Sequence, residues 1–288
     1  APNVMPQIGQ LQVDPAREVI RRVFMEKIIY AKGLDKAGRW IEGIFMPTPA
    51  AVLRAGQLLS QGTAARKGWG DLLIVDVGGA TTDVHSLGKG LPTRAGVVVR
   101  GLPEPYAKRT VEGDLGVRVS VLSLMETVGP DVLAQEVNWT REEVESRAEL
   151  LHAHPDTLPE SDEEWHFDRV LARLAVAHAV SRHVGRLSEL YTPAGLVWVQ
   201  EGKDLSSVAT VIGTGGVLVR SHDPLAVLEG AGKQGDAPLE LRPEDPLFFL
   251  DGSYILASMG LLAQEEPDAA FDILTDSLSN YKLARREQ

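Results

Sequence analysis

The sequence predicts an α/β fold, with a mixed β-sheet, flanking helices and a mostly helical insertion. Two short apolar runs, Leu72–Val75 and Val208–Ile212, are each followed, after no more than two intervening residues, by a cluster of glycines. A short apolar run that is closed by glycine is typical of a buried strand. In residues 162–190, apolar side chains instead repeat every three or four positions, which indicates one buried face of a long helix. These signals together favour the α/β class.

Two helices are expected in the first part of the chain. Asp14 and Pro15 resemble an N-cap followed by proline at the first helical position, and this helix is expected to run to Gly33. Thr48 and Pro49 open a second helix that is expected to end near Gly62. We assign residues 1–70 to helices that pack on the main domain or link to it.

Residues 71–101 are expected to begin the main domain with three consecutive strands. The apolar run from Leu72 is expected to form the first strand. After a glycine turn, residues 82–87 are expected to form its hairpin partner. Residues 93–100 are expected to be the third strand of this meander.

Residues 102–162 have a different character and are expected to form a mostly helical insertion. They contain two amphipathic stretches, around residues 117–128 and 140–151, and end in a polar loop. His152 and His154 lie in this loop, where we expect them to be solvated rather than bound to a metal.

Residues 163–288 are expected to complete the main domain. The long helix over residues 162–190 is expected to place His166, His178 and His183 on its wetter flanks. Further strands are expected at residues 196–199, 208–212 and 247–250, and further helices are expected to begin at Asp251 and Pro267.

The composition excludes several functional classes. The formal net charge is -11, which argues against non-specific binding to nucleic acid and against attraction to anionic membranes. The chain has no cysteine, and therefore no disulfide, thiol nucleophile or cysteine-ligated metal. No apolar run approaches the length of a membrane span, and the first residues lack a signal-peptide pattern. We therefore expect a cytoplasmic protein.

The first glycine cluster predicts a phosphate site. Glycines let backbone N–H groups approach an anion closely, and threonine hydroxyls can donate to phosphate oxygens. A carboxylate at the end of a buried strand can hold hydrated Mg²⁺. The alternative is an ordinary hairpin in which these polar groups only satisfy the turn. The candidates are Asp76, Gly78, Gly79, Thr81, Thr82 and Asp83, of which Asp83 has the alternative role of fixing the hairpin.

The second glycine cluster predicts a backbone surface that a nucleoside or ribose can approach. Its residues are Gly213, Thr214, Gly215 and Gly216. A plain loop is an equally good interpretation of this short pattern. The cluster is not a G-x-G-x-x-G fingerprint, and no Gly-Lys-Ser/Thr follows it, so it favours neither a Rossmann fold nor a P-loop.

Two further pairs of charged residues are weaker candidates. Glu112 and Asp114 are expected either near the nucleotide or, more simply, as a solvated carboxylate pair. Lys203 and Asp204 are expected to form a turn with a local ion pair.

The two glycine clusters resemble the phosphate-2 and adenosine motifs of the actin, sugar-kinase and heat-shock-chaperone ATPase superfamily. A closer resemblance, to the glutamate mutase accessory family called MutL or GlmL, extends over nearly the whole chain. This family is unrelated to the mismatch-repair protein of similar name. The blocks that carry the resemblance are IGQLQVDPAREVIRRVF, VDVGGATTDVHS, KRTVEGDLGVR, QEGKDLSSVATVIGTGG and LDGSYILASMGLL.

The resemblance implies a ribonuclease-H-like, actin-like ATPase domain that binds ATP or ADP with Mg²⁺. Asp76 would orient Mg²⁺ through water, and the two clusters would hold the phosphates and the nucleoside. It also implies a chaperone-like partner of an adenosylcobalamin-dependent mutase or aminomutase, which expels damaged cobalamin at the expense of ATP. The family also has a phosphate-1 hairpin in an N-terminal half, and this chain has one such hairpin only. It therefore resembles a C-terminal portion, with ATPase activity expected only in combination with the other half.

Two other functions are compatible with the same superfamily fold. One is a small-molecule kinase, for which the sequence offers no acceptor-binding signature. The other is a non-catalytic, actin-like assembly module. A shared fold does not decide between these functions.

Overall fold

The computed structural model describes residues 1–7, 11–13, 15–20, 22–23, 46–193 and 195–283. The chain divides into two compact units, residues 1–50 and residues 51–288. In the first unit, residues 15–20 and 22–23 are helical, as expected after Pro15. The rest of that expected helix, residues 24–33, lies outside the described residues.

The helix expected after Thr48 is α3 (Thr48–Gln61), most of which belongs to the second unit. This helix packs against the first hairpin of the main sheet. A Cβ atom at Gly56 would lie 2.9 Å from side-chain carbons of both Ile74 and Leu87. Glycine at this position therefore allows the helix to approach the strands closely.

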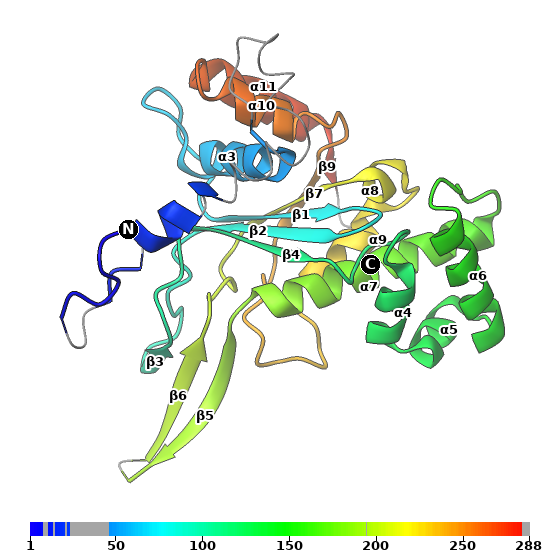
Figure 1. Ribbon diagram of the computed structural model, residues 1–288, viewed down its shortest axis with the longest axis horizontal. Helices are drawn as coiled ribbons and strands as arrows, with labels where there is room; N and C mark the ends of the chain where they lie inside the picture. Colours follow the sequence, from blue (N-terminus) through cyan, green and yellow to red (C-terminus); the bar gives the residue numbers. More distant parts are fainter. Residues whose placement is uncertain (8–10, 14, 21, 24–45, 194, 284–288) are drawn as a thin grey trace. The chain divides into compact units, whose positions relative to one another are not determined.

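The main sheet of the second unit has six strands in the order β4-β2-β1-β7-β8-β9 (Figure 1). β2 runs antiparallel to both of its neighbours, β1 and β4, whereas β1, β7 and β8 run parallel to one another. The sheet is mixed, as predicted. Its strands are β1 (Leu72–Val77), β2 (Thr82–Leu87), β4 (Ala107–Glu112), β7 (Thr210–Thr214), β8 (Leu247–Leu250) and β9 (Lys282–Leu283).

The predicted hairpin is confirmed, but the prediction of its third strand was wrong. Residues 97–100 form β3 (Val97–Arg100), which belongs to a separate sheet. The strand that pairs with β2 is β4, in register from Leu87 opposite Ala107 to Thr82 opposite Glu112. The run AKRTVE of β4 is mostly polar, so its sequence carries little of the apolar signal of a strand.

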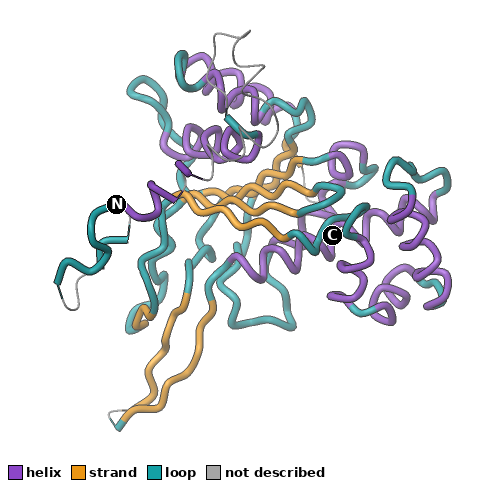
Figure 2. The backbone as a smooth tube through the Cα atoms, in the orientation of Figure 1, coloured by secondary structure: helices purple, strands orange, loops and turns teal. Residues whose placement is uncertain are grey.

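The separate sheet has three strands in the order β3-β6-β5, and its long β5–β6 hairpin is visible in Figure 2. β5 spans Arg186–Thr192 and β6 spans Gly195–Glu201. β6 confirms the strand expected at residues 196–199, whereas β5 was expected to be the end of a helix.

The segment that we expected to be a helical insertion contributes β4 before its helices begin. Three helices follow, namely α4 (Val121–Val128), α5 (Pro130–Val137) and α6 (Arg141–Ala153). α6 begins with a capping box, in which the Thr140 hydroxyl accepts from the Glu143 N–H and the Glu143 carboxylate accepts from the Thr140 N–H.

The long helix is α7 (Asp162–His183), which ends seven residues before the predicted Leu190. Gly185 follows it, and a Cβ atom there would lie 2.7 Å from the carbonyl oxygens of Glu201 and Lys203. The chain turns at this glycine and enters β5. Leu187 and Leu190 have helical spacing in the sequence, but in β5 positions three apart lie on opposite faces, and Leu187 is buried whereas Leu190 is exposed.

Helices cover both faces of the main sheet and make two apolar cores (Figure 1). One core joins α3, α10 and α11 to one face, and the other joins α7 and the insertion helices to the opposite face. The predicted strand at residues 247–250 and the helix that begins at Pro267 are confirmed, whereas the helix expected from Asp251 begins only at Leu256. The remaining helices are α8 (Gly216–Arg220), α9 (Pro224–Leu228), α10 (Leu256–Leu262) and α11 (Pro267–Asn280), with a 3₁₀ turn at Glu229–Ala231.

No helix among the described residues combines the length and the apolar character that crossing a membrane requires.

Candidate functional site

The strand register brings the two glycine clusters to the same end of the main sheet. Asp76 of β1 lies opposite Asp83 in β2 and opposite Thr214 in β7. Because β1, β7 and β8 are parallel, their carboxyl ends meet at one edge, and Asp251 directly follows β8. The Thr214 hydroxyl donates to Asp251 Oδ2 over 3.2 Å, and the Asp251 N–H donates to the Gly213 carbonyl oxygen over 2.8 Å.

Asp76 is an electrostatically unusual carboxylate. Burial, together with the neighbouring carboxylates of Asp83 and Asp251, raises its pKa to about 6 against the opposing effect of Arg109. No described residue donates a hydrogen bond to the Asp76 carboxylate. Its oxygens are therefore free to bind water or a cation.

The turn after β1 is clamped by the segment that precedes the insertion helices. The Gly78 N–H donates to the Thr81 carbonyl oxygen, while the N–H groups of Val117 and Arg118 donate to the carbonyl oxygens of Gly78 and Gly79 over 3.1 and 2.9 Å. These contacts hold the turn in one shape and leave Gly79 at the edge of a pocket.

The polar residues of the first cluster have separate roles. Thr81 is half-buried at the turn. Thr82 is fully buried, and its hydroxyl donates to the Leu115 carbonyl oxygen over 2.7 Å. Asp83 accepts from Arg109 Nη2 over 3.1 Å, which corresponds to the alternative role of fixing the hairpin.

The residues of the second glycine cluster also have separate roles, in packing or in lining the pocket. A Cβ atom at Gly213 would lie 2.7 Å from the Leu228 side chain, so this glycine serves packing in the interior. Gly215 has φ of 109°, and a Cβ atom there would lie 2.3 Å from the Val77 carbonyl oxygen. Gly216 is exposed and lines the pocket. Thr214 is buried against Asp251.

A pocket of about 250 Å³ lies between the two clusters. Glycines from both clusters line it, together with basic and aromatic side chains from three other segments. Its lining residues are Val77, Gly79, Val117, Arg118, Leu158, Pro159, Trp165, Asp168, Gly216, Val217, Arg220 and Tyr254.

Sequence reasoning missed all five charged or aromatic residues of this lining, namely Arg118, Trp165, Asp168, Arg220 and Tyr254. Tyr254 has φ of 54°, which is unusual for a residue other than glycine. The Asp251 carboxylate fixes this turn by accepting from the N–H groups of Ile255 and Leu256. We expected a helix to begin at Asp251, and nothing in the run DGSY showed that a turn would form there and border the pocket.

Glu112 and Asp114 do not line the pocket. Arg182 of α7 donates to both carboxylates, over 2.8 Å to Glu112 and 2.7 Å to Asp114. These hydrogen bonds lower the pKa of Asp114. The pair therefore attaches the end of β4 to α7, which is a structural role that the sequence did not indicate.

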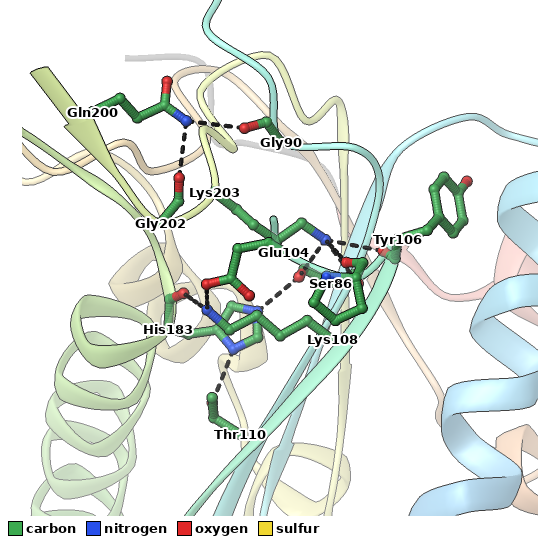
Figure 3. Close-up of polar contacts among 11 residues, drawn as sticks. Ser86, Gly90, Glu104, Tyr106, Lys108, Thr110, His183, Gln200, Gly202 and Lys203 are labelled. Carbon is green, nitrogen blue, oxygen red and sulfur yellow. Dashed lines mark hydrogen bonds and ion pairs between the residues drawn. The ribbon is translucent and has the colours of Figure 1, made fainter. Parts of the chain in front are cut away.

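The prediction for Lys203 and Asp204 was wrong, because neither residue pairs with the other. Lys203 is fully buried, and its ammonium group donates to Ser86, Pro105 and Tyr106 (Figure 3). Burial lowers the pKa of Lys203 to about 8. Asp204 accepts instead from the backbone and hydroxyl of Thr93.

His183 is also buried, although it was expected on a wet flank of α7. Its ring nitrogens contact the hydroxyls of Ser86 and Thr110 over 2.8 and 2.9 Å (Figure 3). Burial places its pKa well below the usual value. These contacts attach the end of α7 to β2 and β4.

No group of three or more His, Cys, Asp or Glu side chains in the described parts of the chain is arranged to hold a metal ion. His152 Nδ1 contacts the Val119 carbonyl oxygen over 2.7 Å. A hydrated Mg²⁺ needs only one or two carboxylates when phosphate oxygens and water complete its coordination. The free carboxylate of Asp76 fits that requirement.

The fold and the site define an α/β protein with a glycine-lined pocket at the carboxyl ends of parallel strands. The model of the family described as MutL protein matches residues 1–278. A curated protein from Clostridium tetanomorphum, named Protein MutL, is 49% identical over 273 residues, which cover 94% of this chain. The chain belongs to the MutL family, which confirms the closer resemblance of its sequence. It spans 59% of the length of that curated relative.

Proposed function

We propose that the chain supplies one nucleotide-binding half of an ATP-dependent accessory protein. The observation that carries this proposal is the β1–β7 register, which joins Asp76 to Thr214 and so brings the two glycine clusters together beside one pocket. Ligands of α/β proteins bind at the carboxyl ends of parallel strands, where this pocket lies.

We further infer a ribonuclease-H-like, actin-like fold for residues 51–288. Support comes from the sheet, in which three consecutive antiparallel strands, β1, β2 and β4, are extended on the other side by the parallel strands β7 and β8. Helices cover both faces of this sheet. The superfamily that the sequence resembles has this kind of domain.

Within this proposal, the first cluster binds the phosphates and the metal. The backbone N–H of Gly79 and the Thr81 hydroxyl donate to phosphate oxygens, Gly78 holds the turn through its bond to Thr81, and Asp76 orients Mg²⁺ through water. Thr82 and Asp83 instead support the turn, because the first is bonded to Leu115 and the second to Arg109. Bound Mg²⁺ neutralises phosphate charge, which is the main electrostatic requirement of phosphoryl transfer.

The second cluster acts mostly through support of the pocket wall. Gly216 faces the pocket, while Gly213 and Gly215 allow close packing behind it. Thr214 and Asp251 fix the neighbouring turn that presents Tyr254. Hydrolysis of ATP requires a second half that contributes the other phosphate loop.

The partner that we propose is an adenosylcobalamin-dependent mutase of the glutamate mutase or aminomutase type. Support comes from membership of the MutL family together with the sequence blocks that resemble the glutamate mutase accessory family. The accessory protein would use ATP to release damaged cobalamin from the mutase.

A reactivation assay tests this role. A mutase inactivated by turnover is incubated with intact cobalamin, Mg-ATP and the full-length accessory protein that contains this chain. We expect activity to return with ATP and to stay lost with the Asp76→Asn variant or without nucleotide. Equal recovery in all three samples would contradict the proposal.

A further inference from the structure

The pocket contains a buried acceptor that no described residue uses. Asp168 of α7 is 3% exposed and lines the pocket. Its Oδ2 atom accepts from Arg118 Nη2 over 2.5 Å, whereas no described donor lies within hydrogen-bonding distance of Oδ1. A buried carboxylate oxygen without a donor is costly, and such atoms call for an explanation.

An aromatic platform lies one helical turn before this acceptor. Trp165 also lines the pocket, and it is stacked on His222 with ring centroids 4.5 Å apart. Residues three apart on a helix lie on the same face, so Trp165 and Asp168 face the pocket together. The exposed ring of His222 supports the tryptophan from outside the pocket lining.

We propose that Asp168 and Trp165 form the subsite for the nucleoside of the bound nucleotide. The ring of Trp165 stacks on the flat base, and Asp168 Oδ1 accepts a hydrogen bond from an N–H or O–H group of the nucleoside. The donor is an exocyclic amine of the base or a ribose hydroxyl, which have the same donor chemistry. This inference rests on the proposed function and assigns the residues that select its ligand.

Arg118 connects this subsite to the phosphate turn. Its backbone N–H donates to the Gly79 carbonyl oxygen, and its guanidinium group holds Asp168. The same residue therefore fixes the position of the carboxylate relative to the turn that faces the phosphates. The positions of the two subsites are set together.

Nucleotide analogues test the acceptor role of Asp168. Mg-ATP, purine riboside triphosphate, which lacks the amine, and 2′-deoxy-ATP are titrated into the wild-type chain and into Asp168→Asn. Asparagine keeps an oxygen for Arg118 but presents an amide donor where the free acceptor was. We expect one analogue to bind the wild type about tenfold or more weakly than ATP, and this ratio to fall towards one in the variant.

Two results would overturn the acceptor role. One is equal binding of ATP and both analogues by the wild type, and the other is an unchanged ratio in Asp168→Asn. In both cases ATP binding itself, and hence the proposed function, would stand. A wild-type chain that binds no ATP would instead overturn the function and the subsite together.

Stacking is tested separately with Trp165→Ala and Trp165→Phe. We expect alanine to weaken ATP binding about fivefold to a hundredfold and phenylalanine to restore most of it, because base–aromatic stacking tolerates the exchange of rings. Inorganic triphosphate, which has no base, should bind all three proteins equally. Unchanged ATP binding by Trp165→Ala, or an equal loss of triphosphate binding, would contradict the stacking of Trp165 on the base.

Discussion

At the scale of single residues, the carboxylates at this edge of the sheet differ in the hydrogen-bond donors that they contact. Asp83 has Arg109 beside it, and Asp251 accepts from two backbone N–H groups and a hydroxyl. Asp76 lies between them without a described donor, and burial together with the negative charges of both raises its pKa. A group whose charge is disfavoured in the folded protein is suited to binding a cation, which removes the repulsion.

We predict that Asp76→Asn stabilises the ligand-free chain at neutral pH. The folded pKa of about 6 is above the unfolded value near 3.8, so the stability from this group is present below the unfolded value and is lost as the pH rises through about 6. Asparagine abolishes that loss. In urea unfolding, the variant should gain on the order of 1–3 kcal/mol between pH 4 and pH 7.5 relative to the wild type.

Asp114→Asn is the matched control for this prediction. Arg182 lowers the pKa of Asp114, so its stabilising effect is present above the unfolded value and is lost as the pH falls through the folded value. The same substitution should therefore destabilise slightly at pH 7.5, by less than about 1 kcal/mol because the pair is exposed. A parallel response of the two variants to pH would contradict our account of Asp76.

Nucleotide binding should depend on pH for the same reason. Protonated Asp76 cannot hold hydrated Mg²⁺, so the affinity for Mg-ATP should fall as the pH decreases through about 6. Calorimetric titrations of Mg-ATP at pH 5.0, 6.0 and 7.5 measure this effect. The same titrations with ATP in EDTA separate the loss of metal binding from the protonation of the ATP phosphates. An equal fall with pH in the absence of Mg²⁺ would exclude Asp76 as its cause.

At the scale of elements, the site depends on a close contact between the end of β1 and the second glycine cluster. Gly215 has φ of 109° and approaches the Val77 carbonyl oxygen. Gly101 has φ of 103°, but a Cβ atom there would meet nothing within 4 Å. The two glycines therefore have similar φ angles, but only Gly215 is closely packed.

We predict that Gly215→Ala costs much more stability than Gly101→Ala. Both variants bear the strain of positive φ, about 1 kcal/mol, and only the first also forces a Cβ atom against a carbonyl oxygen. The difference in unfolding free energy should be roughly 2–4 kcal/mol, measured by chemical denaturation. Similar losses for both variants would mean that the contact at Val77 relaxes freely.

The same scale shows which elements the sequence could predict. The hairpin, α3, β8 and α11 were predicted because an apolar run or a proline start signal marks each of them locally. β4 escaped prediction because its run of AKRTVE is polar and gains strand structure from pairing with β2. The end of α7 was misplaced because Gly185 is required by a contact with residues 201–203, which are distant in sequence.

At the scale of the whole second unit, Lys203 links the two sheets. It follows β6 of the three-stranded sheet and donates to Ser86 in β2 and to the carbonyl oxygens of Pro105 and Tyr106 just before β4 (Figure 3). We predict that Lys203→Met, which keeps the length of the side chain, lowers the unfolding free energy at pH 7 by about 1–3 kcal/mol because these acceptors lose their donor.

The pH dependence of this effect has a defined sign. The folded pKa of Lys203, about 8, is below the unfolded value of 10.5, so the unfolded chain binds more protons between these values and the stability from Lys203 rises with pH. The loss caused by Lys203→Met should therefore be larger at pH 9.5 than at pH 7. A loss that is constant with pH would show that the ammonium is not desolvated.

The candidate site could be predicted only in part, because some of its residues are distant from one another in the sequence. Asp76 and the glycines are local patterns, and the sequence pointed to them directly. Asp168, Trp165 and Tyr254 come from α7 and from the loop before α10, and nothing in their own segments shows that folding brings them beside Gly79. Lys203 was misread because a charged residue in a turn is usually solvated.

The central claim is that this chain carries a nucleotide site organised by Asp76. Calorimetric titration of Mg-ATP and Mg-ADP into the wild-type chain, Asp76→Asn and Asp114→Asn tests it most directly. We predict binding by the wild type and by Asp114→Asn, and a loss of at least tenfold in Asp76→Asn that disappears when EDTA replaces Mg²⁺. Equal affinity of all three proteins for Mg-ATP, or no binding by any of them, would contradict the claim.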